Sequence, residues 1–340
     1  MITLLAAVVA IVGGTVHPVE GEAIEGGTVI ITDGRITAVG AGLVAPAGAT
    51  VIDARGKVVT PGLFHADTAL GLVEIWGAEE TVDLDGGGDP IRAAFRAVDA
   101  FNPQSTVIPV QRAHGITAAL VAPGGGLIAG QAAVMPLWGA EPIAAPAAMV
   151  AGLGGGAPGS RGMALLRLRE ALDDARVYDK NRAAFERRAL RDLAASRLDL
   201  EALVPVVRGE LPLMVRVDRE SEIAAVLRLA EAQKIRVIIS GGAEAWRLAG
   251  PLAAAKVPVI IDPVLNAPES FDQLRTRADA AALLVAAGVP VALSTFGLHE
   301  ARKLRQWAGN AVRAGLPHLA ALRAMTRAPA LMFGLTDRGA

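Results

Sequence analysis

The stretch Val58-Val-Thr-Pro-Gly-Leu-Phe-His-Ala-Asp-Thr-Ala-Leu-Gly-Leu-Val-Glu-Ile75 decides the fold of this chain. Before it, short β-branched segments follow one another at hairpin spacing, and after it strand and helix patterns alternate. The change falls at Pro61-Gly62. The run Leu63–Thr68 is predicted to be a strand, and side chains two positions apart on a strand share one face. Asp67 and Ala69 are therefore expected to point the same way.

Composition limits both the size and the partners of the protein. With 340 residues, the chain suits one barrel-sized domain with a small appendage. Apolar residues make up 52% and aromatic residues 4%, so the core must consist mainly of Ala, Val, Leu and Ile. A net charge of -1 gives no basic surface for nucleic acid or an anionic membrane. The absence of cysteine excludes disulfides, thiolate–zinc sites and thiol catalysis.

The first 60 residues read as a series of strands. These are predicted at residues 8–17, 28–32, 35–39 and 50–53. Asp33-Gly34, between Ile-Ile-Thr and Arg-Ile-Thr, predicts a two-residue hairpin turn. The apolar start, Met1–Val12, is interpreted either as part of the first strand or as a degraded export signal. It falls short of the ~20 residues that a membrane span needs, so no membrane span is expected and the compartment is either cytoplasmic or periplasmic.

From Pro61 on, the pattern predicts an α/β fold with a TIM-like (β/α)8 barrel, preceded by a small, incomplete β-sandwich. The domains are placed at residues 1–60 and 61–340. Six barrel strands are predicted at 63–68, 116–122, 213–217, 236–240, 257–262 and 291–294. The remaining two are expected in the Gly-, Ala- and Pro-rich region 139–160. Helices are predicted at 162–192 with a break near 178–180, and at 220–233, 243–255, 277–287, 300–314 and 319–325.

Several motifs occur in the order found in one enzyme superfamily. They are the stretch Phe64–Ile75, the run Asn102-Pro-x-Ser-Thr-Val-Ile-Pro-Val-x-Arg-Ala-x-Gly-Ile-Thr117, Val121-Ala-Pro-Gly-Gly-Gly-Leu-Ile-Ala-Gly-Gln131, Gly241-Gly-Ala-Glu-Ala-Trp246 and Thr326-x-x-Pro-Ala330. In this order they resemble the imidazolonepropionase-like branch of the amidohydrolase superfamily. The resemblance implies a β-sandwich completed by strands after the barrel. Because this chain stops at Ala340, we expect an open sheet edge and a homo-oligomer formed weakly through it.

The resemblance also implies which metal ligands to look for, and most are replaced. The superfamily has a His-x-His pair on the first barrel strand, where this chain has Asp67 and Ala69. The positions that resemble the histidines of strands five and six hold Arg216 and glycine or serine near Gly242. The strand-eight aspartate corresponds to Phe296 or its neighbours. We therefore expect no bound metal and no other cofactor, the ancestral divalent ion such as zinc having been lost.

The candidate catalytic residues are those expected at the carboxyl ends of the barrel strands, where barrel active sites form. They are His65, Asp67, Arg216, Asp218 and Asp262. Asp67 either forms an acid–base pair with Glu74 or pairs with His65 to cap a loop. Arg216 either pairs with Asp218 and holds a substrate carboxylate, or takes the place of the metal and neutralises Asp67. Glu244, after Gly241-Gly242, fits a helix cap or a site carboxylate.

Two functions follow from this inventory. The first is a hydrolase of carbon–nitrogen bonds of the non-peptide, cyclic amide type, which acts on a small molecule through the altered site. The second is a non-catalytic barrel that binds a small molecule or serves assembly. Descent favours the enzyme, but water without a metal has a pKa of about 16 and needs a strong general base instead.

Overall fold

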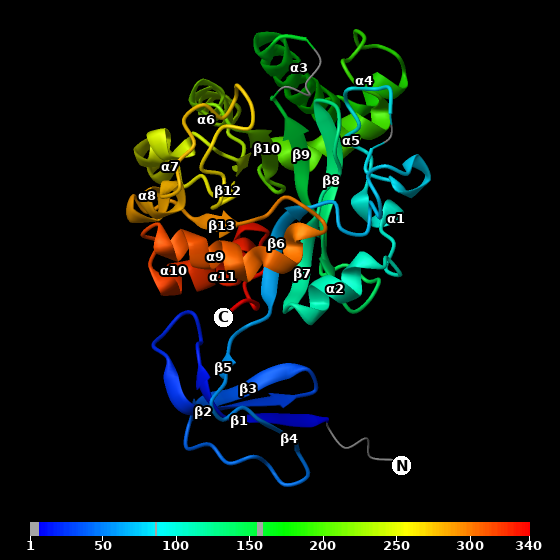
Figure 1. Cartoon of the computed structure of the whole chain (residues 1–340). Helices are drawn as coiled ribbons and strands as arrows, with labels where there is room; N and C mark the ends of the chain where they lie inside the picture. Colours follow the sequence, from blue (N-terminus) through cyan, green and yellow to red (C-terminus); the bar gives the residue numbers. More distant parts are fainter. Residues whose placement is uncertain (1–6, 86, 155–158) are drawn as a thin grey trace, which may run out of the picture. The chain divides into compact units, whose positions relative to one another are not determined.

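The computed structural model describes residues 7–85, 87–154 and 159–340 (Figure 1). These residues form two compact units, one reaching to Gly62 with Gly339 and Ala340, the other running from Leu63 to Arg338. Met1–Ala6, part of the segment that we interpreted as strand or export signal, lies outside the described residues. No helix in the described ranges is long and apolar enough to cross a membrane.

The first unit is a single five-stranded sheet in the order β3-β2-β1-β4, with β5 also pairing with β1. Its strands are β1 (Val8–Val16), β2 (Ile24–Thr32), β3 (Arg35–Ala41), β4 (Thr50–Asp53) and β5 (Val58–Val59). The predicted hairpin is confirmed, because Asp33 and Gly34 both have left-handed φ angles, 50° and 75°, as a type I′ turn requires. The described residues thus supply one layer of the expected sandwich.

The second unit contains a ring of eight strands in the order β13-β12-β11-β10-β9-β8-β7-β6. They are β6 (Leu63–Thr68), β7 (Ile116–Val121), β8 (Ile128–Pro136), β9 (Ala144–Gly152), β10 (Leu213–Val217), β11 (Val237–Gly241), β12 (Val259–Ile261) and β13 (Val291–Leu293). All six predicted strands are present, with bounds shifted by at most two residues. At the closing seam, the Ser294 hydroxyl donates to the Asp67 carbonyl oxygen at 3.2 Å.

Strand β8 departs from the expected (β/α)8 pattern, because it runs antiparallel to both β7 and β9. Only residues 122–127 connect β7 to β8, which is too short for a crossover helix. Gly125 and Gly126, with φ angles of 75° and 67°, turn the chain directly back. Of the two strands expected in 139–160, β9 lies there and β8 precedes the region; residues 155–158 are not described.

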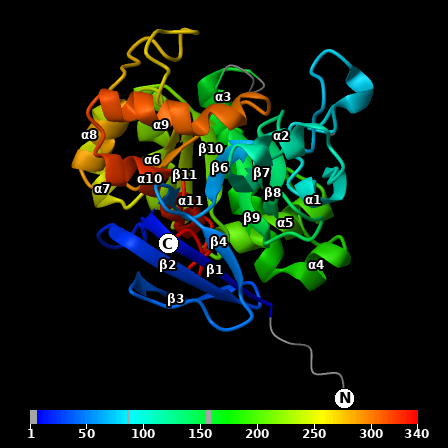
Figure 2. The ribbon, with the colours of Figure 1, turned by 60° about the horizontal axis from the view of Figure 1, so that its bottom comes forward.

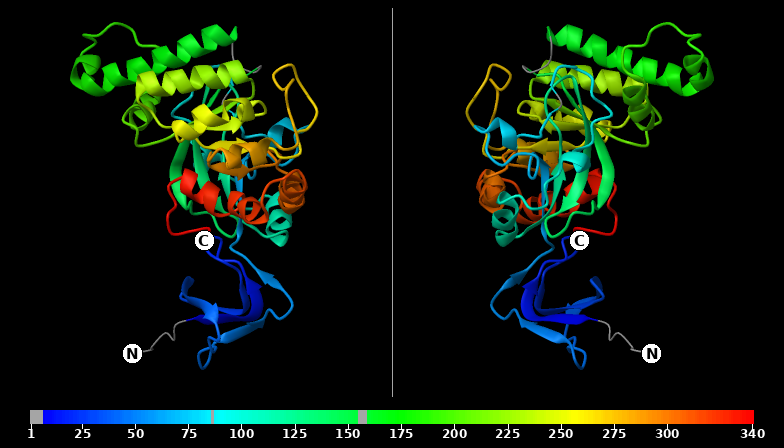
Figure 3. Two further views of the ribbon diagram at one scale, coloured as in Figure 1. Left: turned by 90° about the vertical axis from the view of Figure 1, so that its left-hand side faces the viewer. Right: turned by 90° about the vertical axis from the view of Figure 1, so that its right-hand side faces the viewer.

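Helices lie outside the ring of strands (Figure 2). They are α1 (Ala97–Ala100), α2 (Val107–Ala113), α3 (Arg161–Lys180), α4 (Arg182–Glu186), α5 (Arg197–Val207), α6 (Glu220–Gln233), α7 (Ala249–Ala254), α8 (Ala280–Ala286), α9 (Leu304–Arg313), α10 (His318–Ala324) and α11 (Arg327–Met332). Short 3₁₀ turns are η1 (Glu79–Thr81), η2 (Ala245–Leu248) and η3 (Glu300–Lys303). The break predicted near residues 178–180 falls just after them, at Asn181. Helix α3 runs alongside α6 (Figure 3).

The rows of side chains inside the barrel show which residues lie at the carboxyl ends of the strands. Met214, Ile238, Ile260 and Ala292 all belong to one buried apolar cluster inside the ring. Phe333, which follows α11, stacks on Phe64 in the same cluster, with ring centroids 6.0 Å apart. Because side chains two positions apart share a face, residues 216, 240, 262 and 294 extend the same inward rows past the core. The alternation therefore gathers these four positions at the carboxyl ends of the strands.

Candidate functional site

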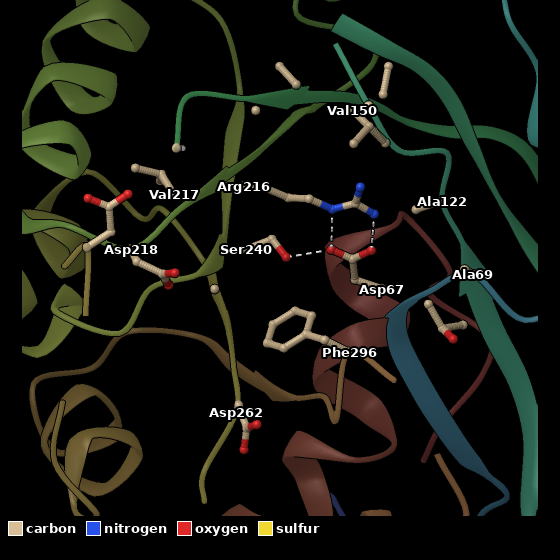
Figure 4. Close-up of a pocket in the computed structure, with 18 of the residues that line it drawn as sticks. Asp67, Ala69, Ala122, Val150, Arg216, Val217, Asp218, Ser240, Asp262 and Phe296 are labelled. Carbon is tan, nitrogen blue, oxygen red and sulfur yellow. Dashed lines mark hydrogen bonds and ion pairs between the residues drawn. The ribbon is translucent and has the colours of Figure 1, made fainter. Parts of the chain in front are cut away.

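A cavity of about 710 Å³ opens at the carboxyl ends of the barrel strands (Figure 4). Strand ends supply its floor, including Asp67, Arg216 and Ser240. Leu84 and Trp76 line it from the segment after β6, and Phe296 follows β13. The size suits a small organic molecule, because typical ligand pockets measure roughly 300–1,000 Å³.

An ion pair between Asp67 and Arg216 occupies the floor of this cavity (Figure 4). Arg216 Nε donates to Asp67 Oδ2 at 3.0 Å and Nη2 donates to Oδ1 at 2.5 Å. The hydroxyl of Ser240 also donates to Asp67 Oδ2, at 2.6 Å, and Arg216 Nη1 donates to the Pro123 carbonyl at 2.8 Å. The guanidinium therefore binds the carboxylate in a bidentate arrangement that uses both carboxylate oxygens.

This arrangement keeps Asp67 ionised. Burial by itself raises the pKa of Asp67, whose exposed fraction is 2%. The charge of Arg216 and the hydrogen bonds from Arg216 and Ser240 outweigh burial, so the pKa of Asp67 lies below its usual range. Burial likewise disfavours the charged form of Arg216, but the Asp67 carboxylate holds the pKa of Arg216 above its usual value. Asp67 and Arg216 thus form a buried ion pair in which both groups are charged.

Asp67 reaches the cavity because the strand alternation breaks at this residue. Phe64 and Ala66 point into the barrel core, so strict alternation would turn Asp67 outward. Its backbone is left-handed instead, with φ of 71°, and the β6–β7 register shifts at the same point. Phe296 is also left-handed, with φ of 53°. One buried hydroxyl joins the two turns: Ser294 Oγ donates to the Asp67 carbonyl and accepts from Phe296 N at 2.9 Å.

His65 does not join the site, which corrects the expectation that all five candidates converge. It follows the regular alternation of β6 and so lies on the face opposite Phe64. There it is fully buried beside Thr295, with His65 Nε2 2.8 Å from the Thr295 hydroxyl, and Thr295 N donates to the same nitrogen at 3.3 Å. Burial lowers the pKa of His65 to about 4, so the imidazole is neutral at physiological pH.

Asp218 and Asp262 do line the cavity, and both differ from Asp67 in having no cationic partner among the described residues. Asp218 accepts from Gln273 Nε2 at 2.9 Å and from Ala243 N at 3.1 Å, and burial raises its pKa. Asp262 accepts from Val264 N at 2.8 Å. Burial raises the pKa of Asp262 to about 6, and the charge of nearby Glu269 adds to this rise. Asp262 therefore titrates close to neutral pH.

These contacts settle the pairings that the sequence left open. Of the two alternatives for Arg216, the ion pair with Asp67 is present and the ion pair with Asp218 is not. Asp67 pairs with neither His65 nor Glu74. Glu74 instead accepts from Thr106 N at 3.2 Å and from the Thr106 hydroxyl at 3.1 Å, which ties two loop segments together.

Glu244 has a capping role, as one of the two interpretations held. Its carboxylate accepts from Glu220 N at 2.9 Å, at the first residue of α6. It therefore caps the neighbouring helix and not the 3₁₀ turn that follows it in the sequence. The same carboxylate accepts from Arg275 N at 3.2 Å, which fixes part of the long loop 263–279.

Loop 263–279 contributes site residues that the sequence patterns did not indicate. It connects β12 to α8 and stands out from the helices in yellow-orange (Figure 3). Glu269, Asp272 and Gln273 from this loop line the cavity. Asp272 is held by ion pairs with Arg219, at 2.7 Å, and with Arg161. No periodic pattern marks these positions; only the length of a loop following a barrel strand indicates a functional segment.

The donor set at the cavity floor does not fit a divalent metal. Both oxygens of Asp67 are already taken by Arg216 and Ser240, and Ala69 has no ligand atom. The guanidinium also places a positive charge where a cation would have to bind. Within the described ranges, no group of three or more His, Cys, Asp or Glu residues is placed to hold an ion.

Comparison with known proteins identifies the fold. No protein-family profile matches the chain, and no curated protein sequence matches it either. Its structure is similar to that of an amidohydrolase from Thermotoga maritima MSB8, with a TM-score of 0.89 and 24% sequence identity over 98% of this chain and 90% of the other. A prolidase complexed with N-methylphosphonate-L-proline gives a TM-score of 0.58 at 16% identity, over 98% and 90%. Molinate hydrolase gives 0.58 at 19%, over 98% and 87%. The chain therefore has the amidohydrolase-superfamily fold.

Proposed function

We propose that this chain is an amidohydrolase-type hydrolase of carbon–nitrogen bonds in small cyclic amides, and that it works without a divalent metal. The observation that carries the proposal is the presence, in one cavity, of an arginine with unused donors and a carboxyl group with a pKa of about 6. A perturbed carboxyl group in a ligand-sized cavity is a good candidate for catalysis. The fold, shared with structures named as hydrolases, supports the same class of reaction.

Arg216 supplies the electrophilic group in this proposal. A guanidinium has five N–H groups, and Arg216 gives three hydrogen bonds to described residues, two to Asp67 and one to Pro123. Five minus three leaves two N–H groups, and 35% of the side chain is exposed. These donors fit the carbonyl oxygen of an amide, whose negative charge grows as water adds to the carbon. Asp67 and the Pro123 carbonyl hold the guanidinium in place.

Asp262 supplies the general base. Its ionised carboxylate takes a proton from a water molecule while the water oxygen bonds to the amide carbon. As the carbon–nitrogen bond breaks, the protonated carboxyl returns that proton to the leaving nitrogen. A base with a pKa close to the working pH serves both steps and contributes about 10²–10⁴-fold to the rate.

The test is hydrolysis of five- and six-membered cyclic amides by protein dialysed against a chelator. We expect turnover to survive dialysis, to fall about 10²-fold or more in Asp262→Asn, and to be unaffected in Glu141→Gln. Glu141 is an exposed carboxylate in the turn between β8 and β9, at the opposite ends of the strands. A stoichiometric divalent metal in elemental analysis of the purified protein, with activity lost on its removal, would contradict the metal-free reaction.

A second candidate function, binding without catalysis, has its own support. The buried Asp67 carboxylate is fully engaged in hydrogen bonds and cannot act as a base or a nucleophile. On this alternative the cavity binds a small molecule and leaves it intact. Ligand-induced thermal stabilisation with no turnover, unchanged in Asp262→Asn, would favour the binding protein over the enzyme.

A further inference from the structure

The lining of the cavity carries more negative than positive charge. Five carboxylates contribute to it, and Arg216 is the one cation among the described lining residues. The carboxylates are Asp67, Asp218, Asp262, Glu269 and Asp272. Two of them are neutralised, Asp67 by Arg216 and Asp272 by Arg161 and Arg219. Asp218, Asp262 and Glu269 have no ion-pair partner in the described ranges.

This surplus lies inside a concave, partly apolar space and not on an open surface. Phe296, Leu265 and Val150 share the lining with the three carboxylates. Burial raises the pKa of Asp218 and of Asp262, which reflects the cost of the uncompensated charge. Walls of low dielectric also focus the field of like charges into the cavity. A positively charged molecule would relieve this cost and an anion would add to it.

The three carboxylates do not converge on one point. No three acidic or histidine side chains of the described residues are close enough to share an ion, so a single metal ion does not match their placement. An organic cation does, because its charge can lie among separate carboxylates. In the view of Figure 4, Asp262 and Asp218 stand apart from each other and from the Asp67–Arg216 pair. The two unused N–H groups of Arg216 add a site for a hydrogen-bond acceptor.

We infer that the cavity takes an organic cation: a small molecule with a protonated amine or guanidinium, bound among Asp218, Asp262 and Glu269, and a carbonyl or carboxylate group, bound by Arg216. This deepens the proposed function by naming its substrate class, and it rests on that function only in regarding the ligand as a substrate. The binding itself requires no catalysis.

Three matched probes test the inference by calorimetric titration of the full chain at pH 7.5. Nα-acetyl-L-lysine, Nα-acetyl-L-norleucine and Nα-acetyl-L-glutamate share an amide and a carboxylate, and differ in carrying a cationic, neutral or anionic side chain. We expect the lysine probe to bind about tenfold or more tightly than the norleucine probe. The glutamate probe is expected to bind most weakly. Added salt is expected to weaken binding of the lysine probe most.

Variants connect the preference to the named carboxylates. Glu269→Gln is expected to weaken the lysine probe by about three- to tenfold and to leave the norleucine probe unchanged, because only the cation contacts Glu269. Asp262→Asn is expected to weaken the lysine probe more than the norleucine probe, because the lost charge affects only the cation. Glu141→Gln is expected to change neither. Equal or tighter binding of the norleucine or glutamate probe overturns the inference, as does failure of the lysine probe to bind at millimolar concentration. Hydrolysis of neutral amides with no preference for cations would refute this inference and leave the proposed reaction standing. Binding of the lysine probe without turnover of any amide would support this inference and contradict the proposed reaction.

Discussion

Replacing Arg216 by methionine tests whether the Asp67–Arg216 pair holds the floor of the cavity together. The substitution keeps an unbranched apolar side chain and removes the charge and all three hydrogen bonds. Asp67, which is 2% exposed, then keeps only Ser240 as a side-chain donor. Removing one partner of a buried ion pair costs about 3–5 kcal/mol, because the other charge stays buried and unpaired.

The expected cost here is smaller than that range. Arg216 retains 35% exposure of its side chain, so solvent already screens part of the interaction, and we expect about 2–3 kcal/mol of destabilisation at pH 8. The double variant Asp67→Asn, Arg216→Met removes both charges of the pair. It is expected to be at least about 1 kcal/mol more stable than Arg216→Met alone.

The pH dependence gives a second check with a definite sign. Without Arg216, burial becomes the dominant influence and raises the pKa of Asp67 above its unfolded value. A raised carboxyl pKa destabilises the folded state above that pKa, and the penalty disappears below the unfolded value of about 4. The destabilisation of Arg216→Met is therefore expected to shrink as the pH falls from 8 to 5.

Urea unfolding followed by the fluorescence of the four tryptophans measures all these differences. Glu141→Gln serves as the control for loss of an ordinary surface charge. Stability of Arg216→Met within about 0.5 kcal/mol of the wild type, or a double variant less stable than Arg216→Met, would refute the reasoning, because the pair would then carry no net interaction.

Three further substitutions test other features of the site. Burial raises the folded pKa of Asp262 from 3.8 to about 6. Asp262→Asn is therefore expected to raise the free energy of unfolding at pH 8 by about 1–2 kcal/mol, after allowance for partial exposure, and to have no effect near pH 4. Equal effects on the urea midpoint at both pH values would contradict this. Ser294→Ala leaves the Asp67 carbonyl and Phe296 N without their buried hydrogen-bond partner. We expect it to lower the free energy of unfolding in urea by about 2–3 kcal/mol. A loss below about 0.5 kcal/mol would show that the two turns keep their conformation without this hydroxyl. In Gly241→Ala the new Cβ would lie 2.6 Å from Asp218 Oδ1, and the residue would have to adopt a φ of 96°. We expect about 1–3 kcal/mol of destabilisation and weaker binding of the lysine probe. Wild-type stability together with wild-type binding would contradict this close contact.

The sequence predicts most of the barrel because its strands and helices have distinct local patterns. Arg216 and Asp262 were located from their places at the ends of β-branched runs, and the rule that barrel strands open at their carboxyl ends was enough to bring them to one cavity. The Asp33-Gly34 turn could be predicted equally well, since Asp-Gly is one of the dipeptides that favour a turn with two left-handed residues.

Other features depend on contacts that no local pattern reveals. Strand β8 consists largely of small residues and contains Gly130 with a φ of 132°, so it lacks the β-branched signature of its neighbours. Helix α5 includes Pro205, a residue that normally argues against a helix interior. The inward position of Asp67 follows from its left-handed backbone, which the regular strand pattern of β6 does not indicate. Its partner Arg216 lies 149 residues away in the chain.

The antiparallel strand β8 has a consequence for the order in which the barrel assembles. Strands β7, β8 and β9 follow one another through short connections, at residues 122–127 and 137–143, so their pairing needs only local loop closure. The seam between β6 and β13 joins residues 227 positions apart, as in the contact of Ser294 with Asp67. Rates of folding fall as contacts become less local. We therefore expect β7, β8 and β9 to pair early and the parallel strands to add next to β9. The seam between β6 and β13, which contains the Asp67 and Phe296 turns, is expected to close last.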